Sequence, residues 1–257
     1  MEQITGLDIF KKHFIEHKNK YVLIGGSACH LNLQEQGLSF GRKTKDLDIV
    51  LLLDVDHVDA EFSKTFWQFI EMGGYSIKQR SGKPVFYRFE DPQNKAFPVM
   101  IELFSRKLES LTLHGDTACT PIPAEDELSS LSAILLNDDY YNLITDNCKT
   151  VDDIQIVTPE CLIALKAKAF LDLSERNADT NKIKKHKNDV FRLAPTLIEE
   201  NRCVVPETII NDLKRFIDTV RTEPIDLRAL NVNVGTVDQI LDVICKIYGI
   251  QNIYFNS

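Results

Sequence analysis

The order of apolar and polar positions predicts two parts of different structure. In the first part, short apolar segments typical of strands alternate with longer segments in which apolar residues recur at helical spacing. The predicted strands are 21–24, 47–53, 75–78, 85–90 and 98–104, with 130–136 and 154–157 as added edge strands, and the predicted helices are 9–17, 27–36 and 57–72. We therefore expect an α/β domain with a mixed sheet.

A helical pattern takes over after Thr158 and Pro159. Thr158 is a good helix N-cap, and Pro159 suits the first helical position. Apolar residues then recur at helical spacing in four segments, which are 160–173, 182–194, 206–220 and 237–247. The sequence therefore predicts an α+β protein of two domains, with an α/β domain over residues 1–157 and an α-helical domain over residues 158–257.

Two aspartates at the start of the strand predicted over 47–53 are the first candidates for chemistry. Asp46 and Asp48 are two residues apart, so their side chains leave the same face of an otherwise apolar strand. Two carboxylates so close repel each other unless a cation lies between them. The pair therefore suggests a divalent metal ion, and the alternative is a pair of solvated acids in the turn before the strand.

A glycine pair lies upstream, where the apolar run 21–24 ends in Gly25, Gly26 and Ser27. Amides at the beginning of the following helix can hold a phosphate, and Ser27 adds a hydroxyl donor. Three basic residues lie just before the aspartates, namely Arg42, Lys43 and Lys45. They can neutralise a triphosphate or a nucleic-acid backbone. The alternatives are a plain tight turn and solvated loop charges, since the spacing matches neither GxGxxG nor a Walker loop.

Glu102 is the single ionisable residue of the strand predicted over 98–104. A buried carboxylate is costly unless it is paired or bound to a metal. Beside Asp46 and Asp48 on a neighbouring strand, it would complete an oxygen-only site of three carboxylates, which suits Mg²⁺. Glu102 or a neighbour could also accept the proton of an attacking hydroxyl. The alternative is a glutamate that faces the surface.

Composition narrows the classes of function. The chain has 257 residues, of which 44% are hydrophobic and 26% charged, as in a globular protein. A net charge of −8 argues against a general nucleic-acid coat but leaves room for a local basic groove. Six cysteines without CxxC spacing argue against zinc. Because the sequence shows neither a signal peptide nor an apolar run of membrane length, we expect a cytoplasmic protein without a membrane partner.

Four short motifs together resemble a known family. They are Gly25-Gly26-Ser27-Ala28, Lys43-Thr44-Lys45-Asp46-Leu47-Asp48, Lys166 and Lys187-Asn188-Asp189. The first two resemble the metal motif of the polymerase-β type of nucleotidyltransferase, in which a later strand adds a third carboxylate. All four are similar to the AbiEii/AbiGii branch, the nucleotidyltransferase toxins of type IV toxin–antitoxin systems. One departure is Arg192, which stands where that branch often has a second aspartate.

The resemblance implies an enzyme that moves a nucleoside monophosphate from a nucleoside triphosphate to an acceptor hydroxyl, with Mg²⁺ as cofactor. The implied acceptor is a tRNA 3′ end or a protein, and the implied partner is an antitoxin protein. The implied metal ligands are Asp46, Asp48 and Glu102, the implied nucleotide-binding residues are Gly25, Gly26, Ser27, Lys45 and Lys166, and the implied catalytic residues are the three carboxylates with Lys166 and Asp189.

Other interpretations remain open for the whole protein and for the two helical residues. The protein could be a small-molecule transferase similar to the enzymes that adenylylate aminoglycosides, or a non-catalytic nucleotide-binding module that mediates interactions. Lys166 lies on an apolar helix face and could simply snorkel to solvent, and Asp189 could form a surface ion pair. A basic track through Lys182, Lys184, Lys185 and Lys187 would favour RNA as acceptor.

Overall fold

The structure is a computed structural model that describes residues 4–52, 60–80, 83–104 and 137–251. It separates into two compact units. Of the described residues, the first unit contains 4–31, 42–52, 60–80, 83–104 and 148–157, and the second contains 32–41, 137–147 and 158–251. Two segments that precede residue 157 in the sequence, 32–41 and 137–147, thus group with the helical residues.

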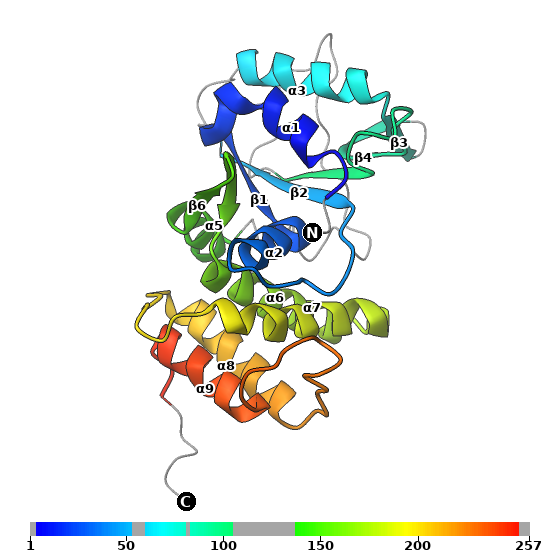
Figure 1. Ribbon diagram of the computed structural model, residues 1–257. Coiled ribbons are helices and arrows are strands. Elements are labelled where there is room, and N and C mark those ends of the chain that lie inside the picture. Colours follow the sequence, from blue (N-terminus) through cyan, green and yellow to red (C-terminus); the bar gives the residue numbers. More distant parts are fainter. Residues whose placement is uncertain (1–3, 53–59, 81–82, 105–136, 252–257) are drawn as a thin grey trace, which may run out of the picture. The chain divides into compact units, whose positions relative to one another are not determined.

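The first unit is built on a mixed sheet, in which seven strands are found among the described residues (Figure 1). The strands are β1 Tyr21–Ile24, β2 Asp46–Leu51, β3 Ser76–Arg80, β4 Lys83–Glu90, β5 Met100–Phe104, β6 Cys148–Val151 and β7 Ile154–Val157, and their order in space is β3-β4-β5-β2-β1-β7-β6. The β2–β5 and β1–β7 pairs are parallel, and the other neighbours are antiparallel. The α+β class expected from the sequence is confirmed.

Burial explains which strands the sequence could predict. All four residues of β1 are buried because β2 and β7 flank the strand, so it reads as a continuous apolar run. The prediction that 154–157 is an edge strand was wrong, since β6 pairs with β7 on its outer side. Strand β6 was missed because its residues are half-buried or exposed and lack an apolar pattern. The strand predicted over 130–136 lies outside the described residues.

Helices of the first unit pack an aromatic cluster against the sheet. They are α1 Leu7–His13, the 3₁₀ helix η1 Ile15–Lys20 and α3 Ala60–Gly73. The rings of Phe10, Phe14 and Tyr21 contact one another, and those of Phe10 and Phe14 also contact the ring of Phe69 in α3. The helix predicted over 9–17 therefore changes to 3₁₀ geometry after His13. Positions 57–59 of the helix predicted over 57–72 lie outside the described residues.

The second unit is helical in all its regular elements among the described residues. These are α5 Asp138–Asp146, α6 Pro159–Glu175, α7 Thr180–Leu193, the 3₁₀ helix η3 Ala194–Thr196, α8 Glu207–Arg221 and α9 Val237–Tyr248. Thr158 accepts a hydrogen bond from the Cys161 amide, and Pro159 opens α6, as predicted. Helix α6 is buried along most of its length and packs against α7 and α8. No described helix is long and apolar enough to cross a membrane.

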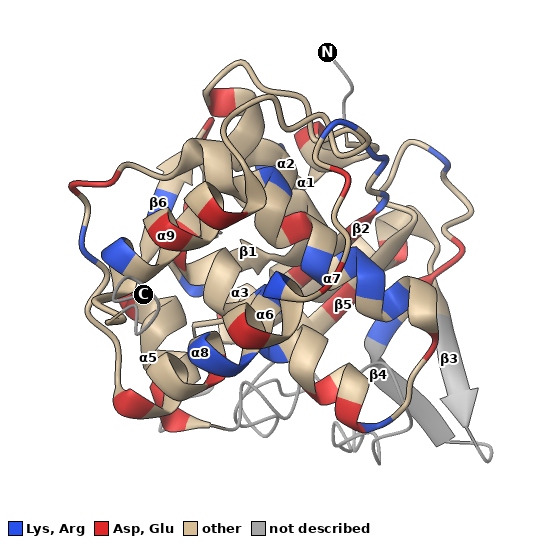
Figure 2. Ribbon diagram, turned by 90° about the horizontal axis from the view of Figure 1, so that it is seen from below, with Lys and Arg blue, Asp and Glu red and all other residues tan. Residues whose placement is uncertain are grey.

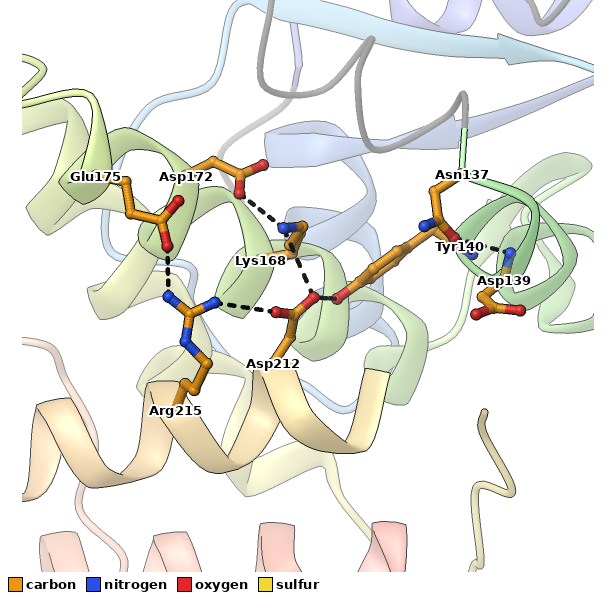
Figure 3. A network of polar contacts seen from close by, with 8 residues as sticks. All are labelled: Asn137, Asp139, Tyr140, Lys168, Asp172, Glu175, Asp212 and Arg215. Carbon is orange, nitrogen blue, oxygen red and sulfur yellow. Dashed lines mark hydrogen bonds and ion pairs between the residues drawn. The ribbon is translucent and has the colours of Figure 1, made fainter. Parts of the chain in front are cut away.

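A polar network fastens α5, which the sequence did not predict, to α6 and α8 (Figure 3). The Tyr140 hydroxyl donates to Asp212 Oδ2 at 3.0 Å. Lys168 lies 2.8 Å from Asp172 Oδ1 and 3.7 Å from Asp212 Oδ2. Arg215 reaches the second Asp212 oxygen, Oδ1, at 3.5 Å. Each buried acid of this network thus has a cationic or hydroxyl partner, which is what keeps such a group tolerable away from water.

Candidate functional site

The first candidate site is a row of polar side chains across three neighbouring strands. Arg88 of β4 lies opposite Glu102 of β5, and Glu102 lies opposite Asp48 of β2. Residues directly opposite each other project from the same face of a sheet. Asp46 shares that face with Asp48 because the two are separated by one buried residue, Leu47. The strand register therefore places the three expected carboxylates on one face.

The turn after β1 packs directly against this row. Gly25 has φ +65°, and a Cβ atom added there would lie 1.7 Å from Asp48 Oδ2. A residue with a side chain would therefore be strained in its backbone and would collide with the carboxylate. Helix α2 begins at this residue and runs to Glu35. The beginning of a helix, with its unpaired amides, thus adjoins a carboxylate of β2.

Gly26 and Ser27 pack the turn against the beginning of β2 and the residues just before it. A Cβ atom added to Gly26 would lie 2.8 Å from Thr44 Oγ1 and 3.3 Å from Arg42 Nη2. Ser27 is fully buried, and its hydroxyl donates to the backbone carbonyl of Asp46 at 2.5 Å. Its one hydroxyl hydrogen is thus used within the protein, so a phosphate would meet the backbone of Ser27 and not this donor.

Arg42 is a cation that lies beside the turn. Its guanidinium approaches Gly26, and its side chain is half-buried. Lys45, the residue that the sequence assigned to the nucleotide, is exposed, and its carbonyl accepts a backbone hydrogen bond from Val99. Thr44, named from the sequence only as part of the motif that contains Asp46, lies beside Gly26 as well. Its contact with Gly26 joins residues far apart in sequence, so spacing alone gave no signal for it.

Glu102 is held inside the sheet and does not face the surface. Its side chain is 14% exposed, and Arg88 donates to Oε1 through Nε at 2.9 Å and through Nη2 at 2.5 Å. Burial raises the pKa of Glu102 to about 7; the Asp48 charge and a hydrogen bond with Asp48 add to this rise, and Arg88 opposes it. The carboxylates of Asp48 and Glu102 therefore lie close together, and the positive charge of Arg88 only partly offsets their negative charges.

The donor set fits a hard divalent cation in its chemistry. Asp46, Asp48 and Glu102 offer oxygen atoms only, which Mg²⁺ prefers, and a cation beside Asp48 and Glu102 would relieve their repulsion. Within the described ranges, however, no group of three His, Cys, Asp or Glu side chains is close enough to hold a metal ion as it stands. Binding by all three carboxylates would therefore require a side-chain rearrangement.

The two helical candidates come together in the second unit. Lys166 Nζ of α6 lies 3.3 Å from Asp189 Oδ2 of α7, and Arg192 Nη1 donates to Oδ1 at 3.2 Å. The side chains of Lys166 and Asp189 are 6% and 0% exposed. Lys166 therefore does not snorkel to solvent, and Asp189 does not lie on the surface. The Arg192 guanidinium lies 6.0 Å from the ring centroid of Phe40, within reach of a cation–π contact.

Comparisons with known proteins find one similar solved structure and no similar sequence of known function. No protein-family profile matches the chain, and no curated protein matches it significantly. The chain is similar in structure to an antigenic nucleotidyltransferase-like protein from Paracoccidioides brasiliensis, with 15% identity and a TM-score of 0.47 over 90% of this chain and 92% of that chain. A likeness at this level assigns no activity, so function has to be inferred from the residues of the chain itself.

Proposed function

We propose that the protein is a Mg²⁺-dependent nucleotidyltransferase, which moves a nucleoside monophosphate from a nucleoside triphosphate to an acceptor hydroxyl. The observation that carries this proposal is the packing of Gly25 onto the Asp48 carboxylate. It brings a helix N-terminus, which favours phosphate, to a carboxylate row, which favours Mg²⁺. A metal-bound triphosphate needs both features at one place.

The residues of the first unit then have separate roles. Asp46 and Asp48 would hold the cation, which supplies charge neutralisation on the triphosphate and a lowered pKa of the attacking hydroxyl. Gly25 and Gly26 let the chain approach the phosphates without a side chain in between. Glu102 would be the third carboxylate or would accept the hydroxyl proton, and the raised pKa that it has in the absence of a cation suits the second role.

The transfer itself is an exchange of bonds at the α-phosphorus. The acceptor oxygen forms a new bond to this phosphorus as the bond to the leaving pyrophosphate breaks. The proton of the acceptor hydroxyl passes to Glu102, and pyrophosphate carries away the electron pair of the broken bond. No oxidant or reductant is needed. The half-buried guanidinium of Arg42 beside Gly26 is placed to offset the negative charge of the triphosphate.

For the acceptor, the basic residues of α7 favour RNA. Figure 2 shows Lys and Arg on this helix, which carries Lys182, Lys184, Lys185 and Lys187. Lys184 and Lys185 are exposed, whereas Lys187 is buried and paired with Glu223. Exposed lysines on one helix suit a phosphate backbone. We therefore propose a toxin-like enzyme that acts on a tRNA 3′ end under an antitoxin, with a protein or small-molecule acceptor as outcomes of the test.

Lys166 and Asp189 belong to this proposal as a pair. Asp189 forms ion pairs with both Lys166 and Arg192, so one acid is joined to two cations. We propose that Lys166 contacts a phosphate of the nucleotide or of the acceptor while Asp189 keeps its ammonium group in place. The burial of both side chains gives such a lysine a fixed position, at a lower entropy cost than a mobile surface lysine would pay.

Labelling of a cell extract tests the activity. Purified protein with Mg²⁺ and α-³²P-labelled nucleoside triphosphates should label an acceptor and release pyrophosphate, and Asp46→Ala should abolish both because it removes a metal ligand. Asp152→Asn is the matched control, since that carboxylate lies in the same unit and is 71% exposed. RNase or protease treatment then identifies the acceptor. If no fraction is labelled with any of the four nucleotides, the enzyme reading fails.

A further inference from the structure

Arg88 lies at the end of the carboxylate row, and among the described residues its carboxylate partner is Glu102. Two hydrogen bonds, from Nε at 2.9 Å and from Nη2 at 2.5 Å, end on Glu102 Oε1. The other carboxylate oxygen, Oε2, receives neither of them. The register places Arg88 and Asp48 on opposite sides of Glu102, so the glutamate lies between the arginine and the aspartate.

This contact restricts how the Glu102 carboxylate can lie. Two N–H groups from one edge of a planar guanidinium meet a single oxygen, which fixes the direction of that oxygen. The side chains of Arg88 and Glu102 are 17% and 14% exposed, so water competes little for either group. A lysine at position 88 would keep the charge, but its ammonium is a point charge on a flexible stem and could not hold the carboxylate by an edge.

We propose that Arg88 is a positioning residue for the third carboxylate of the site. It holds Glu102 by Oε1 and thereby directs Oε2 to the side of Asp48, where the metal-binding carboxylates lie. The inference rests on the proposed function, because it gives Arg88 a task only if a cation binds at Asp46 and Asp48. Groups behind a metal ligand commonly act in this way, and their loss typically weakens metal binding about 10- to 100-fold.

Charge and position make opposite predictions for metal affinity, which allows a sharp test. If Arg88 acted only through its charge, Arg88→Gln would remove a nearby positive charge and would strengthen cation binding. If Arg88 positions Glu102, the same variant should bind the cation more weakly. Arg88→Lys retains the charge and loses the planar edge, so positioning predicts about 10-fold weaker binding, whereas a purely electrostatic role predicts no change.

The experiment measures Mn²⁺ alone by electron paramagnetic resonance, in which the signal of the free ion falls as the ion binds. It compares the wild type with Arg88→Gln and Arg88→Lys, after circular dichroism has shown that each is folded. Arg215→Gln is the control, because it breaks an arginine–carboxylate pair with Glu175 in the other unit. In a Glu102→Gln background, Arg88→Lys should have no further effect, since the group that it positions is gone.

The outcomes distinguish a failure of the positioning role of Arg88 from a failure of the metal site itself. Suppose that the wild type binds Mn²⁺ and that Arg88→Lys binds it equally well or more tightly. This result would overturn the positioning role and leave the proposed function standing. An effect of Arg88→Lys that persists in the Glu102→Gln background would overturn it as well. If the wild type binds no more Mn²⁺ than Asp48→Asn does at any concentration tested, both the metal site and this role of Arg88 are refuted.

Discussion

Replacement of Glu102 by glutamine should change how stability depends on pH. Burial and the neighbouring Asp48 raise the pKa of Glu102 from 4.5 to about 7 in the folded protein. The folded state therefore binds the proton more tightly than the unfolded state does. The stabilisation that this proton provides is complete below pH 4.5 and is lost as the pH rises through 7. Glutamine has a similar shape and does not ionise.

The magnitude follows from the difference between the two pKa values. It is about 2.5 pH units, and each unit corresponds to about 1.4 kcal/mol. The Glu102→Gln protein should thus match the wild type near pH 4 and exceed it by about 3 kcal/mol in free energy of unfolding at pH 8. Because glutamine cannot ionise, the gain should appear between pH 4.5 and 7 and then remain level.

The single tryptophan makes the measurement specific to the relevant unit. Trp67 lies in α3, and its ring contacts that of Phe89, the residue after Arg88 on β4. Urea unfolding followed by its fluorescence at a series of pH values, in EDTA, therefore reports on the unit that contains Glu102. Glu199→Gln, at a half-exposed side chain, is the control. A stability difference that stays constant from pH 4 to pH 8 would refute the reasoning.

Three further changes test other parts of the structure. Gly25→Ala should abolish Mg²⁺-dependent nucleotide binding in a calorimetric titration. The control is Gly37→Ala, where φ is +70° and the space around the residue is open; it should retain binding and lose only about 1 kcal/mol of stability to backbone strain. Asp48→Asn should also abolish that binding in calorimetry, with stability unchanged or slightly raised because a like-charge repulsion is removed. Asp189→Asn should lower the free energy of unfolding by about 3–5 kcal/mol, because it leaves the buried Lys166 and the half-buried Arg192 without their acid. Asp152→Asn, at a surface pair, should change it by less than about 1 kcal/mol.

Local patterns were enough to predict the elements on which the site stands. The apolar run of β1 ends at Gly25, where the turn begins. This strand could be predicted because all four of its residues are buried and apolar or aromatic, so the sequence carries no competing signal. The cap at Thr158 marked the beginning of α6 for the same local reason. Asp46 and Asp48 could be named because strand periodicity alone puts them on one face. Each of these features depends on residues close together in the sequence.

The missing parts of the site depend on strand register. Arg88 meets Glu102 only because β4 and β5 pair with these two residues opposite each other. The sequence between them contains no marker that distinguishes this register from one shifted by a residue, and such a shift would turn Arg88 to the other face. Whether Glu102 faced the surface could not be decided for the same reason. Contacts across strands therefore had to come from the structure.

The departure from the family pattern at Arg192 has a local explanation. An aspartate at this position would lie three residues from Asp189 on α7, where two acids on one helix face repel each other. With arginine there, Asp189 receives a second cation on the oxygen that Lys166 does not use. Arginine at this position thus adds no second carboxylate to the helix and gives Asp189 a further hydrogen-bond donor. The resemblance to the toxin branch thus pointed to Asp189, which the structure shows as a buried acid between two cations, while the catalytic role that the resemblance implies for it stays a prediction.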